Sequence, residues 1–291
     1  LEATVVPASL ATARQSNITH RAAVASTQPL KAGALSSFFL HFNNGDHKLR
    51  QIQVLQKGGK AEAVFADQNS DDPFAFDASW YQANYQLVEV TGLGGGEFDI
   101  ALPNAPLGHV PVLGGFALQR KDGTDANVRT IGVRLTPDNK SVRVILVDDQ
   151  GPDFRGFERT IAMGFVMSMV PFGQIEATAL TAAQGASRLA NKEFANNGMR
   201  NYHATVQIAW VPKAAVLATQ SVSSGSRVIE GGTPPKSSDK TALTGFLFHF
   251  GNSDHHLLEL GVHLANSEAV KFQDNNRDDP IQWYVDYVTL K

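Results

Sequence analysis

Apolar and polar residues alternate with a period of two along much of this chain, which is the pattern of strands that bury one face. The clearest case is the run Phe246, Phe248 and Phe250, followed after a polar turn by Leu258, Leu260, Val262 and Leu264. The intervening Gly-Asn-Ser-Asp contains residues that adopt turn conformations easily. The pattern therefore predicts a β-hairpin, and a further aromatic strand is expected over 282–288.

The hairpin belongs to a sequence unit that occurs more than once. The segment SFFLHFNNGDHKLRQIQV from Ser37 aligns without a gap with GFLFHFGNSDHHLLELGV from Gly245, and both continue into an acidic loop. A third segment, GFALQRKDGTDANVRTIGV from Gly115, keeps the Gly-Phe start, the turn and the loop but lacks the histidines. We predict an all-β protein of tandem antiparallel, jelly-roll-like β-sandwich repeats over 1–91, 97–212 and 213–291, with the glycine-rich 92–96 as a linker.

One segment departs from the β pattern. Residues 174–191, QIEATALTAAQGASRLAN, are rich in alanine and space their apolar residues as an amphipathic helix does. This helix would be an insertion in the middle repeat. It is expected either to cover a sheet edge or to act as a lid or an assembly contact.

Composition narrows the classes of function. The chain has 291 residues, 43% of them hydrophobic, and a net charge of −3, so it can bury a core and offers no basic stripe for nucleic acid. It contains no cysteine, which excludes disulfides and thiolate metal sites. The longest apolar stretch, 161–172, is much shorter than the ~20 residues of a transmembrane helix, so no transmembrane segment is expected. The start at Leu1 favours an exported, extracellular or virion-surface location.

The acidic loop is the sharpest chemical feature. Asp67, Asn69 and Asp71, and again Asp274, Asn276 and Asp278, place oxygen ligands at alternate positions, as calcium loops do. These residues are the candidate metal ligands, with Ca²⁺ as the expected ion. The alternative is a solvated turn in which Asp and Asn bond their own backbone.

Histidines recur beside the hairpin turn, His41 with His47 and His249 with His255. Such a pair could bind a transition metal or a ligand, and the alternative is a structural role in the turn. We take His47 and His255 as candidate ligand-binding residues. A Gly-x-Ser-x-Gly elbow and a His-Glu-x-x-His motif are both absent from the sequence, so an enzyme is not expected.

Aromatic residues beside the acidic loops are candidates for recognition. Trp80 and Tyr81 follow the first loop, and Trp283 and Tyr284 follow the last. Aromatic rings next to Asp and Asn suit stacking on a sugar, which would make the protein glycan-binding. The alternative is packing in the core, because a strand turns every second side chain inward.

The strands WYVDYVTL from Trp283 and YHATVQIAWV from Tyr202 resemble those of the H-type lectin domain. That resemblance implies a β-sandwich and carries over no site residue. The expected function is a non-catalytic structural or binding protein of an exterior assembly (a virion, an appendage or a secreted assembly), which self-associates or joins a larger one. Two other classes stay open: a metal-dependent enzyme using the His and Asp clusters, and a secreted pore-forming toxin that rearranges 161–191.

Overall fold

The computed structural model describes residues 8–19, 21–69, 72–121, 123–148, 202–224, 239–263, 270–276 and 279–291. These residues form three antiparallel sheets, so the predicted all-β class is confirmed. The helix predicted over 174–191 lies outside the described residues. Among the residues described, no helix is long and apolar enough to cross a membrane.

The strands follow one another in three units of the same plan. The first unit contains β1 (Ser9–Thr19), β2 (Arg21–Val24), β3 (Gly33–Phe42), β4 (Gln51–Lys57), β5 (Lys60–Ala66) and β6 (Pro73–Gln82). The middle unit contains β7 (Gln86–Gly94), β8 (Gly96–Ala101), β9 (His109–Arg120), β10 (Val128–Leu135), β11 (Ser141–Asp148) and β12 (Tyr202–Pro212). The last unit follows the 3₁₀ turn Lys213–Ala215 and contains β13 (Val216–Ser224), β14 (Lys240–Phe250), β15 (Glu259–His263), β16 (Val270–Gln273) and β17 (Ile281–Leu290).

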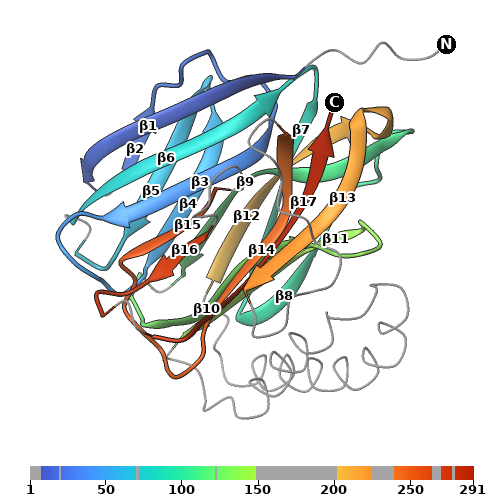
Figure 1. The fold of residues 1–291 in the computed structure, drawn as a ribbon. Helices are drawn as coiled ribbons and strands as arrows, with labels where there is room; N and C mark the ends of the chain where they lie inside the picture. Colours follow the sequence, from blue (N-terminus) through green and yellow to red (C-terminus); the bar gives the residue numbers. More distant parts are fainter. Residues whose placement is uncertain are drawn as a thin grey trace, which may run out of the picture.

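Each sheet combines strands from two units. The sheets run β1-β6-β3-β15-β16, β2-β5-β4-β9-β12-β7 and β13-β17-β14-β10-β11-β8. In every sheet the strand that opens the repeated hairpin pairs with the second hairpin strand of another unit: β3 with β15, β9 with β4, and β14 with β10. In Figure 1 the red strands β15 and β16 accordingly lie beside the blue strands of the first unit. The three units are thus linked in a cycle with pseudo-threefold symmetry.

Three phenylalanines mark the centre of this cycle. Phe38, Phe116 and Phe246 occupy the same position of the three repeats and come from β3, β9 and β14. Each pair of their rings has its centroids 5.0 Å apart, and all three side chains are fully or almost fully buried. Aromatic pairs in such tilted or edge-on arrangements stabilise by about 0.5–1.5 kcal/mol beyond their area burial. We call these residues the phenylalanine triad; they belong to one hydrophobic core shared by all three sheets.

The units are not self-contained sandwiches, and the division at 1–91, 97–212 and 213–291 stays a prediction. Their hairpins are shared between sheets, and the middle unit already begins with β7 at Gln86. The physical reason is that a ladder of backbone hydrogen bonds does not depend on which unit supplies the partner strand. Closing the hairpins around one core buries all three apolar faces together.

The glycine-rich stretch 92–96 is a corner of the molecule, which corrects its interpretation as a linker. Here β7, at the edge of one sheet, passes directly into β8, at the edge of the next. A Cβ on Gly94 would lie 2.4 Å from the ring of Phe98, closer than any side chain permits. The glycines therefore allow two strands to meet closely where the sheets join.

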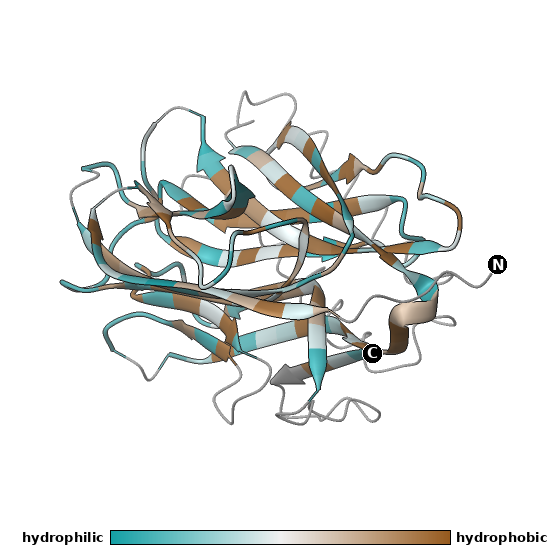
Figure 2. Cartoon of the chain, turned by 90° about the horizontal axis from the view of Figure 1, so that it is seen from above, coloured by the Kyte–Doolittle hydropathy of each residue, from teal (hydrophilic) through white to brown (hydrophobic). Residues whose placement is uncertain are grey.

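Burial along the strands follows the alternation read from the sequence. In β6 every second residue is buried, from Phe74 through to Gln82, and Figure 2 shows the corresponding alternation of hydrophobic and hydrophilic residues along the strands. Among the inward residues, Trp80 donates its indole N–H to the backbone oxygen of Gly114, 2.8 Å away. Its one polar group is thus satisfied inside the core.

Candidate functional site

The repeated hairpin turns interlock at one end of the molecule. Short backbone bridges join the turn of each unit to the turn of another, and they pair His47 with Leu257, Leu49 with Ala126, and Val128 with His255. The His47–Leu257 bridge is typical, with N–O distances of 2.9 and 2.8 Å in the two directions. The bridges repeat the cyclic order of the sheets, so the two histidines are positioned by contacts between units.

In the first unit, His47 lies between an amide and two carboxylates. Its Nδ1 lies 3.2 Å from Asp72 Oδ2 and 3.7 Å from Asp67 Oδ2. Its Nε2 lies 3.0 Å from the side-chain oxygen of Asn44, and the Asn44 amide nitrogen donates to Asp72 Oδ1. The ring also packs against Phe42, with centroids 4.8 Å apart. We call His47, Asp67 and Asp72 the first cluster.

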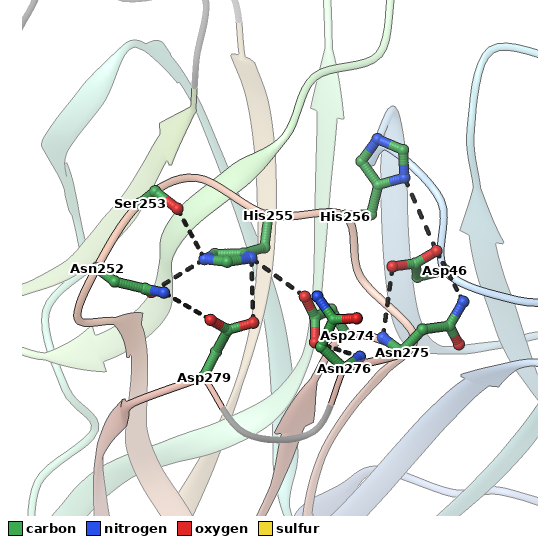
Figure 3. Close-up of polar contacts among 9 residues, drawn as sticks. All are labelled: Asp46, Asn252, Ser253, His255, His256, Asp274, Asn275, Asn276 and Asp279. Atoms are coloured by element: carbon green, nitrogen blue, oxygen red, sulfur yellow. Dashed lines mark hydrogen bonds and ion pairs between the residues drawn. The ribbon is translucent and has the colours of Figure 1, made fainter.

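The last unit repeats this arrangement with His255, Asp274 and Asp279, the last cluster, which Figure 3 shows in close-up. His255 Nδ1 lies 3.1 Å from Asp274 Oδ2 and 3.4 Å from Asp279 Oδ2. On the other side of the ring, Nε2 lies 3.0 Å from Asn252 Oδ1 and 2.9 Å from Ser253 Oγ. The imidazole also packs on Phe250, at 4.6 Å between centroids.

The hydrogen bonds define the state of the imidazole. Because the amide nitrogen of Asn252 donates to Asp279, its oxygen faces the ring, and His255 Nε2 must carry a hydrogen to donate to it. This leaves Nδ1 facing two carboxylates. The hydrogen bond from Asn252 also lowers the pKa of Asp279 below its ordinary value, which favours the ionised carboxylate. The ring nitrogen and the two carboxylate oxygens thus converge on one point.

The middle unit gives the equivalent aspartate a different partner. Asp148 aligns with Asp67 and Asp274, but the position of the histidine is taken by Ala126 and that of the neighbouring phenylalanine by Arg120. The Arg120 guanidinium forms an ion pair with Asp148, and both side chains are more than nine-tenths buried. Tyr202 also donates to Asp148, and its ring lies 5.5 Å from the guanidinium carbon. One arginine thus takes the place beside the aspartate that an imidazole has in the outer units.

No protein-family model matches this chain, and no curated protein matches it. The interpretation of the site therefore rests on its geometry.

The candidate calcium ligands do not converge within the described residues. Asp67 Oδ1 accepts the backbone N–H of Asn69 at 2.9 Å, and Asp274 Oδ1 accepts that of Asn276 at the same distance. The two aspartates are buried, whereas Asn69 and Asn276 are exposed. These contacts form the backbone-bonding turn considered as the alternative. Asp71 and Asp278 lie outside the described residues, and binding of Ca²⁺ stays a prediction.

The structure joins two landmarks that the sequence presented separately. The histidine of the hairpin turn and the first aspartate of the acidic loop meet in one cluster, together with Asp72 or Asp279, which the sequence pattern did not single out. The asparagines Asn44 and Asn252 were also missed as partners of the ring. One signal was available in the sequence: the middle repeat lacks the histidine and also replaces the phenylalanine with Arg120, as coupled positions do.

The aromatic candidates divide between core and surface. Trp80 is completely buried and Tyr284 is 2% exposed. The guanidinium carbon of Arg134 lies 4.2 Å from the centroid of the Tyr284 ring and covers it. Neither ring can stack on a sugar, because neither face is open. Tyr81 and Trp283 are half-buried and keep a part of their surface accessible.

The other two hairpin histidines are not part of the clusters. His249 is buried opposite Thr130, with 2.8 Å between Nδ1 and the hydroxyl oxygen, whereas His41 lies opposite Glu259, with 3.3 Å between Nδ1 and Oε2. Burial, with a smaller contribution from the charge of Arg129, lowers the pKa of His249 to about 4. The same repeat position therefore acquires different properties from the unit that it faces.

Proposed function

We propose that this chain is a non-catalytic structural module of an exterior assembly, in which the interlocked units form a rigid body that self-associates or joins a larger structure. One observation carries this proposal. The polar landmark of the outer units is replaced in the middle unit by the Arg120–Asp148 ion pair, which keeps a partner for the buried aspartate and discards the imidazole. Because an ion pair can replace the histidine cluster, we infer that the cluster stabilises the contact between units and does not catalyse a reaction.

The surroundings of the clusters support the same role. His47 and His255 sit within backbone bridges between units, and Asp46 of the first unit accepts a hydrogen bond from the Asn275 side chain of the last unit at 2.9 Å. Figure 3 shows this second contact beside the last cluster. Polar side chains at this end of the molecule thus connect the hairpin turns of different units.

Glycan binding is the competing function, and it now depends on fewer residues. Because Trp80 and Tyr284 are core residues, a sugar platform would have to use Tyr81 or Trp283. The calcium-stabilised form of this hypothesis would also need Asp71 and Asp278, which lie outside the described residues.

Sedimentation of the purified chain over a range of concentrations, together with a glycan array, tests the proposal. We expect a defined oligomer, or association with a partner assembly, and no array signal that Trp283→Ala removes. A monomer at every concentration that binds a glycan through Trp283 would overturn the structural role. Turnover of a substrate that is lost with a chelator would instead favour a metal-dependent enzyme.

A further inference from the structure

We propose that His255 Nδ1, Asp274 Oδ2 and Asp279 Oδ2 bind a divalent first-row transition-metal ion such as Zn²⁺, and that His47, Asp67 and Asp72 form a second, equivalent site. An imidazole nitrogen with two carboxylate oxygens is a ligand set that zinc accepts in proteins. In each cluster the three ligand atoms all lie within 4.8 Å of one another. The chain would thus hold two ions, one in each outer unit.

The distances fit a tetrahedral ion. With Zn–N and Zn–O bonds of the usual length, two ligand atoms in tetrahedral coordination stand about 3.4 Å apart. His255 Nδ1 lies 3.1 and 3.4 Å from its two carboxylate oxygens, and His47 Nδ1 lies 3.2 and 3.7 Å from its own. An ion could enter either cluster with only small movements of the side chains. A water molecule would complete the coordination, because three protein ligands leave one position open.

Each ligand is held by a further hydrogen bond. The Nε2 of the ring donates to an asparagine oxygen, as the free ring nitrogen of metal-binding histidines usually does to a neighbouring acceptor. The Oδ1 of Asp274 accepts the backbone N–H of Asn276, and the Oδ1 of Asp279 accepts the side-chain N–H of Asn252. These bonds leave both Oδ2 atoms directed at Nδ1, which is the arrangement of a prepared site.

The same bonds disfavour calcium at this position. Calcium takes 6–8 oxygen ligands and commonly binds carboxylates through both oxygens. Here the second oxygen of each aspartate already accepts a hydrogen bond, and one of the three ligands is a nitrogen. The clusters therefore suit a smaller, nitrogen-preferring ion.

Two independent observations indicate that a cation belongs here. In the middle unit the equivalent aspartate, Asp148, is paired with the buried guanidinium of Arg120, so the protein itself supplies the positive charge where the histidine is absent. In the last cluster, Asp279 Oδ2 is buried and accepts no hydrogen bond from the described residues, although it faces His255 Nδ1 at 3.4 Å. A buried carboxylate oxygen that accepts no hydrogen bond is suited to coordinating a metal ion.

Equilibrium dialysis of the full chain against Zn²⁺, with Co²⁺ as a spectroscopic probe, tests this proposal. We expect two ions per chain in the wild type, one in Asp72→Asn, one in Asp279→Asn and none in the double variant. Asparagine keeps the shape of aspartate, and circular dichroism checks that each variant is folded. His256→Gln is the matched control, because His256 is adjacent and exposed but lies outside the cluster, 3.9 Å from Asp46. It should still bind two ions.

A second variant keeps the metal ligands and removes only a side chain that positions them. Asn252→Ala keeps all three ligands and should weaken the last site by about 10–100-fold while the first site is unchanged. Zinc at about 100 times its dissociation constant should also raise the melting temperature by about 5 °C per site. A stoichiometry that the two aspartate variants do not change, or a preference for Ca²⁺ over Zn²⁺, would overturn the proposal. An absence of zinc binding by the wild type would overturn it as well.

Discussion

The outer units and the middle unit hold the same buried aspartate with different partners. In the first and last units a histidine ring lies between the aspartates and a phenylalanine, whereas in the middle unit Arg120 reaches from the phenylalanine position and Ala126 leaves room for it. In the middle unit the guanidinium of Arg120 places a positive charge beside the carboxylate, whereas the outer units place an imidazole there. The comparison teaches that two positions change together to give the buried aspartate its partner.

The comparison presumes that the three units fold as one body. A substitution in the phenylalanine triad tests whether they do. Phe116→Ala removes a fully buried ring that contacts its equivalents from both other units. We expect a loss of about 4 kcal/mol in the free energy of unfolding, from lost burial and the cavity left behind. Urea denaturation should show a single transition that moves as a whole. Leu107→Ala, at a fully exposed position, is the control. Two separate transitions, with only one of them shifted, would show that the units fold independently.

Exchanging the partners tests the coupled change directly. Arg120→Phe leaves Asp148 buried without its guanidinium and should cost about 3 kcal/mol, because one member of a buried ion pair has been removed. Adding Ala126→His to that variant rebuilds the chemistry of the outer units and should recover at least half of the loss. The measurement is a double-mutant cycle of unfolding free energies. Additive effects of the two substitutions would contradict the view that these positions act as a pair.

Acidification tests the burial of His249 opposite Thr130. Its pKa is lowered to about 4, mainly by burial, from an ordinary value of 6.5. The unfolded chain therefore binds a proton at this residue between pH 6.5 and 4 while the folded chain does not, and the stability contribution is complete above pH 6.5 and falls as the pH falls towards 4. At pH 5 the loss is about 2 kcal/mol relative to pH 7.

His249→Gln should remove this part of the pH dependence, as measured by urea unfolding at pH 7 and pH 5. His109→Gln, at a position on the surface side of β9, provides a comparison. An equal loss of stability on acidification in the wild type and in His249→Gln would place the sensitivity elsewhere.

An ion pair on the surface gives the smallest expected effect. Arg14 of β1 pairs with Asp77 of β6, but the Arg14 side chain is 78% exposed. Arg14→Ala should change the free energy of unfolding by less than about 1 kcal/mol, because solvent screens exposed pairs. Thermal unfolding beside Arg120→Phe checks this. A loss as large as that at Arg120 would mean that pairing, and not burial, determines the cost.

Much of the fold could be predicted from the sequence, and the reason is visible at single positions. The alternation of Phe246, Phe248 and Phe250 indicated a buried face, and the aligned Phe38, Phe116 and Phe246 were recognisable as one repeated position. Which strands pair was not predictable from this pattern. His41 and His249 are equivalent in the repeat, yet they face Glu259 and Thr130, which come from two different units. Backbone hydrogen bonds do not depend on the unit that supplies the partner strand, so the alternation alone does not indicate the partner.

The candidate site was predicted in parts. His47 and Asp67 were both identified, each with a different ion or role, because about 20 residues of strand and turn separate them and only the hairpin β4–β5 brings them together. Asp72 was hidden by its position before Pro73, where a turn explains it equally well. For Trp80 and Tyr284, the choice between core and surface depended on which face of the strand lies inward. Trp80 is on the buried face of β6, and Tyr284 is buried next to a buried Val285, where β17 departs from simple alternation.

The cyclic order of the units has a consequence for synthesis on the ribosome. Strand β3 emerges early, but its partner β15 lies more than 200 residues later in the chain, so the sheet that they share cannot close until most of the chain has been made. Until then β3 presents an open edge, and unpaired edges invite association between nascent chains. Contacts of such long range also slow the final folding step. Production of this protein should therefore depend on how long the nascent first unit is kept from its neighbours, and not only on the stability of the finished molecule.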